Sequence, residues 1–160
     1  MSEERAAGAD MLPALRARLE AEGLTCIVRC GDKVLTSTQR GIRPLLDWIA
    51  QGEDVAGGAA ADRIVGKAAA LLYVLMGVRE VYAGVLSESG LAVLRGHGVR
   101  VCYGELTPRI INRAGTGLCP MEETVLAVSD PAEAYAALRR TAQRLAEGGA
   151  PRTCAEPEQK

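Results

Sequence analysis

The sequence predicts an α/β domain built on a mixed sheet of about five strands, with helices packed on its faces. Two observations indicate this class. The first two predicted strands, at 24–30 and 33–38, are joined by the tight turn Gly31-Asp32 as in an antiparallel hairpin. From residue 55 onward, strands alternate with helices. That alternation is typical of parallel strands joined by crossover helices.

Two amphipathic helices frame the predicted hairpin. Residues 11–22 place Leu12, Leu15 and Leu19 on one helical face, which we expect to pack on the sheet. We expect a second helix over 41–49, where a proline near the start has the fixed φ angle that a first helical turn needs.

The stretch that follows the small-residue strand at 55–61 is the most apolar of the chain. Residues 64–78 are apolar or small except for Lys67, a pattern typical of a buried helix. We expect Asp62 to cap this helix and Gly77 to end it. Since a buried unpaired charge is costly, Asp62 and Lys67 are also candidates for ligand binding. The lysine would reach toward Asp62 or a bound anion, or else extend to the helix rim.

The second half of the chain continues the alternation of strands and helices. We expect a strand at 80–86, a short capped helix at 87–94 and another strand at 99–103. A long irregular segment at 105–121, with a helical turn at 108–111, then leads to an amphipathic helix at 131–147. The predicted organisation is an α/β domain over 11–128, a C-terminal helix over 130–147 and a disordered polar tail over 148–160.

Composition excludes several classes of function. The 160 residues carry a net charge of −1, with no Phe and one Trp, so neither a basic surface nor stacking platforms for nucleic acid are expected. No segment has the apolar length of a membrane span, and no signal-peptide pattern is visible. Five scattered cysteines suit reduced thiols better than a disulfide framework. We therefore expect a cytoplasmic protein that binds neither membrane nor nucleic acid.

Four blocks of sequence, in order, resemble one family. The blocks are GIRPLL at 41–46, ADRIVGKAA at 61–69, VLSE at 85–88 and IINRAGTGLCPME at 110–122. They resemble the bacterial and archaeal domain of unknown function numbered 1893, over roughly residues 12–126. The resemblance implies a three-layer α/β/α fold like that of the cytidine deaminases. It implies no established activity.

The zinc motifs of the deaminases are missing from the corresponding positions. Zinc deaminases use a His or Cys two residues before a Glu at the start of one helix, and Pro-Cys-x-x-Cys at the start of the next. Here those positions read Ala61-Asp62-Arg63 and Leu86-Ser87-Glu88-Ser89, while Cys119-Pro120-Met121-Glu122 repeats half of the second motif elsewhere. We expect no zinc site, no hydrolytic deamination and no other cofactor.

Two polar clusters could bind an anion. Ser87, Glu88 and Ser89 open a helix, where hydroxyls and free N–H groups suit a phosphate or carboxylate. The alternative is a capping cluster with a solvated glutamate. The second cluster is a loop that contains Asn112, Arg113, Gly115, Thr116 and Gly117. Its glycines could direct backbone N–H groups at an anion that the Arg113 guanidinium also binds. The alternative is a loop held in place by its own polar side chains.

Three residues are candidates for catalysis. Cys119 would be a nucleophile if Arg113 stabilised its thiolate, although no histidine base is close in sequence and a structural role stays open. Glu88 and Glu122 are candidate general acids or bases.

The leading hypothesis is a metal-free domain that binds a small anionic, nucleotide-like metabolite. Its pocket would combine Asp62, Lys67, Ser87, Glu88, Asn112, Arg113 and Cys119. One alternative is a zinc-independent enzyme that uses Cys119, Glu88 or Glu122 on a nucleoside-like or amide-bearing ligand. Another is a structural or oligomerisation module, in which small, Ala-rich helices form a homodimer face.

Overall fold

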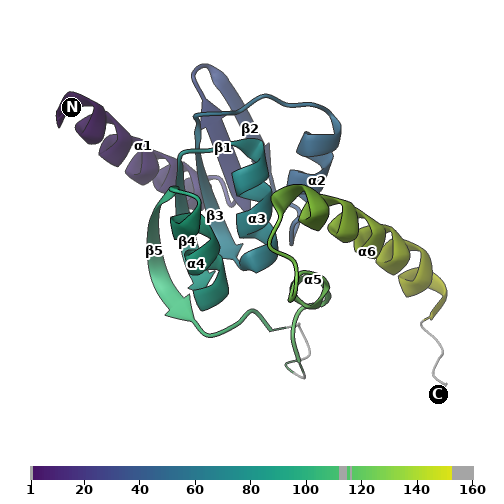
Figure 1. The fold of residues 1–160 in the computed structure, drawn as a ribbon. Helices are drawn as coiled ribbons and strands as arrows, with labels where there is room; N and C mark the ends of the chain where they lie inside the picture. The colour runs from purple at the N-terminus through teal and green to yellow at the C-terminus, as the bar shows by residue number, and fades with distance from the viewer. Residues whose placement is uncertain (1, 112–114, 116, 153–160) are drawn as a thin grey trace.

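The computed structural model describes residues 2–111, 115 and 117–152, with side chains described from residue 11 to residue 147 of that range. In chain order the elements are α1 (Ser2–Ala21), β1 (Cys26–Cys30), β2 (Lys33–Ser37), α2 (Arg43–Ala50), β3 (Ala59–Val65), α3 (Lys67–Met76), β4 (Glu80–Ser87), α4 (Glu88–Gly96), β5 (Arg100–Thr107), α5 (Pro120–Thr124) and α6 (Pro131–Arg152). Figure 1 shows their arrangement.

The strands form one five-stranded mixed sheet in the order β2-β1-β3-β4-β5. Strand β1 is antiparallel to both β2 and β3, whereas β3, β4 and β5 are mutually parallel. The predicted mixed sheet is therefore confirmed. Strand β3 lies where the antiparallel half meets the parallel half. The carboxyl end of such a strand is where α/β sheets commonly bind ligands.

Helices cover both faces of the sheet. On one face, α1 buries Leu12, Leu15 and Leu19 against a small cluster that includes Ile27 of β1. On the other face, the larger core is built by α2, α3, α4 and α6 together with the inward side chains of the strands. Figure 1 shows α3 and α4 in front of the sheet and α1 behind it. The arrangement buries α3 on nearly all sides, as its sequence predicts.

The start of α3 differs from the prediction. The helix begins at Lys67 with Gly66 as its N-cap residue, while Asp62 lies inside strand β3. The expectation that Asp62 caps this helix is therefore wrong. The physical reason is that Ile64 and Val65, both β-branched, continue the strand and pair with β4.

Strand β5 is longer than predicted, because it runs through Gly104 to Thr107. A β-carbon on Gly104 would lie 3.0 Å from the carbonyl oxygen of Gly84 on the neighbouring strand. The glycine thus marks a close approach of two strands and does not end the strand.

Two other boundaries differ. In place of the predicted helical turn at 108–111, Ile111 forms an isolated antiparallel bridge with Leu118, and the short helix α5 follows at Pro120–Thr124. Helix α6 continues to Arg152, so 148–152 is helical and not part of a disordered tail. Residues 153–160 lie outside the described residues.

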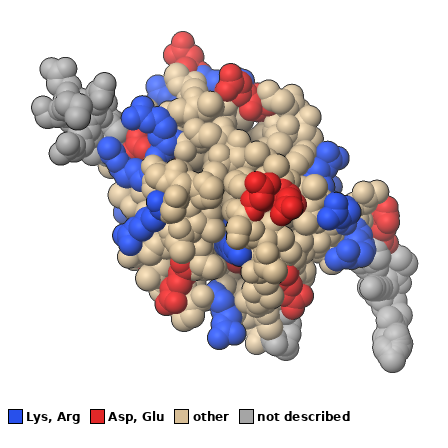
Figure 2. Space-filling model, viewed as in Figure 1, with Lys and Arg blue, Asp and Glu red and all other residues tan. Residues whose placement is uncertain are grey.

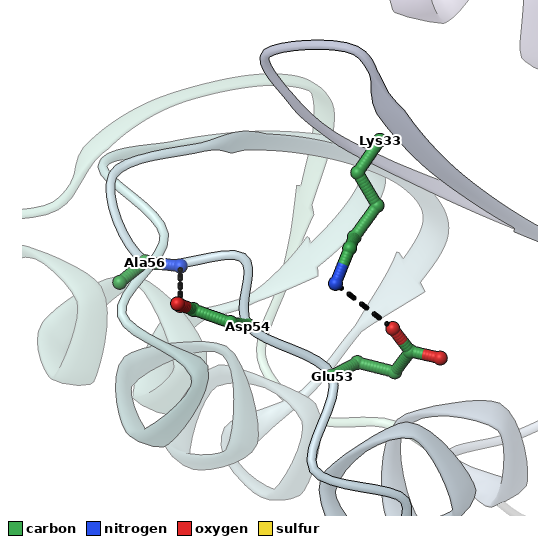
Figure 3. Close-up of polar contacts among 4 residues, drawn as sticks. All are labelled: Lys33, Glu53, Asp54 and Ala56. Carbon is green, nitrogen blue, oxygen red and sulfur yellow. Dashed lines mark hydrogen bonds and ion pairs between the residues drawn. The ribbon is translucent and has the colours of Figure 1, made fainter.

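The loop that leads into β3 is fastened to the hairpin by polar contacts (Figure 3). Lys33 Nζ lies 3.1 Å from Glu53 Oε1, which ties the loop to β2. The next residue, Asp54, accepts a hydrogen bond from the Ala56 N–H at 3.3 Å through Oδ1. The ion pair is partly exposed and adds little stability by itself. Together the two contacts set the path by which the chain enters β3.

Charged side chains of both signs are interspersed on the face shown in Figure 2, with wide uncharged areas between them. This pattern offers no extended basic surface on that face. Within residues 2–152, leaving aside those not described, no helix is long and apolar enough to cross a membrane.

Candidate functional site

A cleft of about 590 Å³ opens at the carboxyl end of β3. It gathers segments that are distant in sequence: the residue before β1, the loop before α2, the end of β3, the start of α3, and the segment around α5. Its size is that of a small-molecule pocket. The polar side chains along it belong to Thr25, Arg40, Asp62, Arg63, Cys119 and Glu122.

Asp62 is the most unusual group in this cleft, because its side chain is a buried carboxyl, 9% exposed, within a strand. The Tyr73 hydroxyl of α3 donates to its Oδ2 at 2.7 Å, and the Ile64 N–H donates to its Oδ1 at 3.2 Å. Burial raises the pKa of Asp62 to about 7, against the opposing effect of hydrogen bonds from Tyr73 and backbone N–H groups. Asp62 therefore gains and loses its proton close to neutral pH.

Cys26 and Tyr73 complete a buried cluster around this carboxyl. Cys26 lies directly opposite Asp62 in the pairing of β1 with β3. Burial, and then the charge of Asp62, raise the pKa of both the Cys26 thiol and the Tyr73 phenol well above their usual ranges. Both groups stay protonated at neutral pH. The ionisable group of the cluster near neutrality is thus Asp62.

Glu122 of α5 supplies the side-chain cap that Gly66, the N-cap residue of α3, cannot provide. Its carboxylate is buried, and it accepts hydrogen bonds from the backbone N–H groups of Lys67 and Ala68, each at 2.9 Å. These are two of the free N–H groups with which every helix begins. An anion-binding position at this helix start is therefore filled by a side chain 55 residues further along the chain. Glu122, a candidate acid or base from sequence, has both oxygens engaged in this contact.

The Lys67 side chain does not reach toward Asp62. Its Nζ donates to the carbonyl oxygen of Leu126 at 3.1 Å, just beyond α5. Lys67 therefore fastens the α5 segment to α3 from the other side. The side chains of Lys67 and Glu122 thus both connect the start of α3 with the segment around α5.

The start of α4 lies outside the cleft. The buried Ser87 is the N-cap of α4, and its Oγ accepts the Gly90 N–H at 2.9 Å. Glu88 is exposed. The starts of α3 and α4 lie close together, since a β-carbon on Gly90 would lie 3.1 Å from the Gly66 carbonyl, but neither Ser87 nor Glu88 lines the cleft around Asp62. A role of these two residues in ligand binding therefore stays a prediction.

Only part of the predicted anion loop is described. Gly115 and Gly117 are exposed, and Gly115 has a positive φ of 74°. Asn112, Arg113 and Thr116 lie outside the described residues, so their contribution to ligand binding stays a prediction.

Cys119, the candidate nucleophile, lies beside this loop and is half-buried along the cleft. The structure thus brings Asp62, Cys119 and Glu122 to one cavity.

Sequence reasoning missed several residues of the cleft. It also missed Tyr73, which contacts Asp62 from the core and does not itself line the cleft, although a signal for it existed. A tyrosine within a buried helix of alanines and leucines needs a hydrogen-bond partner for its hydroxyl. Arg40 and Arg63, both exposed along the cleft, carried no such signal. The Arg63 Nε donates to the carbonyl of Leu24, which directs this side chain along the cleft wall.

Among the described residues, no group of three or more His, Cys, Asp or Glu side chains lies close enough together to hold a metal ion.

The comparisons identify the family. The family model for a domain of unknown function, DUF1893 (TM1506), matches residues 14–141. The chain belongs to the DUF1893 family. It is similar to the crystal structure of a DUF1893 family protein, TM1506, from Thermotoga maritima, with 25% identity and a TM-score of 0.74 over 84% of this chain and 90% of that one. No curated protein matches the sequence.

Proposed function

We propose that this DUF1893 domain binds a small anionic, nucleotide-like metabolite in the cleft at the carboxyl end of β3. The observation that carries the proposal is the cleft itself, with a buried carboxyl at Asp62 and the exposed guanidinium groups of Arg40 and Arg63 along its lining. Arginine forks match the geometry of phosphate and carboxylate groups. A cavity of this size accommodates a molecule of nucleotide size.

In this proposal the loop at 112–117 completes the site. It follows Ile110 and precedes Cys119, both of which line the cleft. Its Arg113 would add a third guanidinium, and its glycines would add backbone N–H groups for the anion. The proposed site leaves out three of the residues expected from the sequence: Ser87 caps α4, Glu88 is exposed outside the cleft, and the Lys67 side chain donates to Leu126.

We further propose that the fold is deaminase-like. Support comes from the mixed sheet with α3 and α4 beginning at the carboxyl ends of β3 and β4. Zinc does not fit at these helix starts. They carry Gly66-Lys67 and Ser87-Glu88, which offer neither a thiolate nor an imidazole to a zinc ion. The proposed function therefore involves no zinc at these positions.

A ligand panel tests the binding function. The purified domain would be heated with inorganic phosphate, nucleoside monophosphates or dicarboxylates, and the unfolding temperature recorded. A ligand at about 100 times its Kd stabilises the folded state by about 2.7 kcal/mol, which is a clear shift. We expect Arg40→Ala to reduce the shift. Arg95→Ala, at an exposed arginine of α4 away from the cleft, should leave it unchanged. Equal shifts in both variants would place the binding elsewhere.

A second candidate function is a zinc-independent enzyme, which is favoured by the position of Cys119 in the same cleft as Asp62. A catalytic thiol reacts at lower pH than an ordinary one. Alkylation with iodoacetamide at graded pH, followed by peptide mass spectrometry, compares Cys119 with the exposed Cys102 outside the cleft. Faster reaction of Cys119 near neutral pH would favour an enzyme, and equal reaction would favour a binding domain.

A further inference from the structure

We infer that the ligand of the cleft carries, besides its anionic group, a nitrogen cation such as an amidinium, guanidinium or ammonium group, which contacts the carboxylate of Asp62. This inference rests on the proposed function and specifies the second end of the ligand. It follows from the surroundings of Asp62 inside the cleft.

Asp62 is held by neutral donors. Its two oxygens accept from the Tyr73 hydroxyl and the Ile64 N–H. In the part of the chain that the structure describes, no lysine or arginine lies within 4.0 Å of this carboxyl, since none of the ion pairs there includes it. A buried carboxylate without a cationic partner is costly. A cation delivered by a ligand would remove much of that cost.

The carboxylate also has acceptor capacity left for a ligand. Two carboxylate oxygens offer about four acceptor positions, and the Tyr73 hydroxyl with the backbone N–H groups of Ile64 and Arg63 does not use them all. Asp62 lines the cleft, which is the side from which a ligand group would approach it. Planar amidinium and guanidinium groups present paired N–H donors that match a carboxylate.

The other charged groups along the cleft assign the two ends of the ligand. Both oxygens of Glu122 accept N–H groups at the start of α3, and Cys26 and Tyr73 remain protonated beside Asp62. The Asp62 end is therefore negative overall and repels an anion. The side chains of Arg40 and Arg63, which are exposed along the same cleft, supply its positive charge. The lining thus suits a zwitterionic molecule, with its cation at Asp62 and its anion at the arginines.

The ionisation of Asp62 makes the contact dependent on pH. Because burial raises the pKa of Asp62 to about 7, the carboxylate predominates above neutral pH and the neutral acid predominates below it. A cation binds the carboxylate in preference to the acid, so its affinity should fall by about thirtyfold between about pH 8 and pH 5.5.

The test uses acetamidinium chloride as the cationic probe, acetamide as its neutral counterpart, and the amide signal of Ile64 in a ¹⁵N-correlated NMR spectrum as the reporter. The Ile64 N–H donates directly to Asp62, so its signal senses that carboxyl. We expect acetamidinium to shift the signal saturably near pH 8 and at least tenfold more weakly near pH 5.5. We expect acetamide to have little effect at either pH.

An Asp62→Asn variant provides the decisive comparison. It should abolish the response to acetamidinium while the spectrum stays that of a folded protein. Loss of the response would support the inference. An unchanged response in the variant, or no shift of Ile64 in the wild-type protein, would overturn it. Failure of the anion panel with a positive acetamidinium result would instead reject the anionic ligand, so the two failures are distinguishable.

Discussion

The carboxylate of Glu122 occupies the space next to Gly66 in which a side chain would begin. A β-carbon on Gly66 would lie 2.6 Å from the carboxylate carbon and from Oε2 of Glu122. The missing side chain is what allows Glu122 to reach the first N–H groups of α3. The N-cap of α3 therefore depends on two residues that are distant in sequence.

Replacing Gly66 with alanine should destabilise the domain by about 1–3 kcal/mol, because the added methyl group forces the buried Glu122 carboxylate away from α3. Urea unfolding followed by circular dichroism measures the change. Gly96→Ala is the control, since Gly96 lies at the other end of a helix, as the last residue of α4, and a β-carbon there meets nothing within 4 Å. If both variants unfolded at the same urea concentration, the contact between Gly66 and Glu122 would not limit stability.

Glu122→Ala should cost about 2–4 kcal/mol of unfolding free energy, because it leaves two buried backbone donors of α3 without an acceptor. Glu123→Ala removes an exposed carboxylate from the next position of α5 and should change the unfolding free energy by less than about 0.5 kcal/mol. Chemical denaturation of both variants provides the comparison. Equal stability of the two would mean that Glu122 does not cap α3.

The stability of the wild-type domain should fall as the pH rises from about 4 to about 7, because of Asp62. Its pKa is raised from 3.8 in the unfolded chain to about 7 in the folded state. The folded state thus holds this proton more tightly, and that advantage is lost as the pH passes through the folded pKa. Asp62→Asn should remove this dependence and make the protein more stable than the wild type near pH 8.

The asparagine can keep both contacts, with its oxygen toward the Ile64 N–H and its NH₂ group toward the Tyr73 oxygen. Urea midpoints near pH 5 and near pH 8 test the prediction. The same pH dependence in both proteins would show that Asp62 ionises normally.

Tyr73→Phe should raise the pKa of Asp62 further, because the Tyr73 hydroxyl is the hydrogen bond that favours the carboxylate most. The loss of this buried bond should also destabilise the protein by about 1–2 kcal/mol near neutral pH. A ¹³C NMR titration of the Asp62 carboxyl measures the pKa directly. A titration midpoint that stayed the same or fell would mean that Tyr73 does not stabilise the carboxylate.

The sequence predicted most elements of this fold, because their signals are local. Alternation and turn residues placed the hairpin, and Gly77 and Ser87 end α3 and begin α4 as expected. The start of α3 was misplaced because Asp62 resembles an N-cap residue. The cap that operates is Glu122, and no pattern around residue 62 indicates a partner 55 residues beyond Lys67.

The candidate site was predictable only in part, for the same reason. An aspartate beside a buried helix indicated Asp62, and Cys119 and Glu122 came from a polar block that does reach the cleft. The contact of Asp62 with Tyr73 joins a strand to the second half of the following helix, so it depends on how α3 packs on the sheet. Likewise, Ser87 looked like part of the site because it begins a helix, but packing directs it into the core.

Native mass spectrometry of the freshly purified protein tests the central claim, ligand binding in the cleft, most directly. Ile64 is 55% exposed along the cleft, so Ile64→Trp should fill the cavity without disturbing the core. After incubation with a metabolite extract of the host cells, the wild-type spectrum should show a bound small molecule with an acidic group, and the variant should show none. A wild-type protein without a bound molecule, or the same molecule on both proteins, would contradict the account.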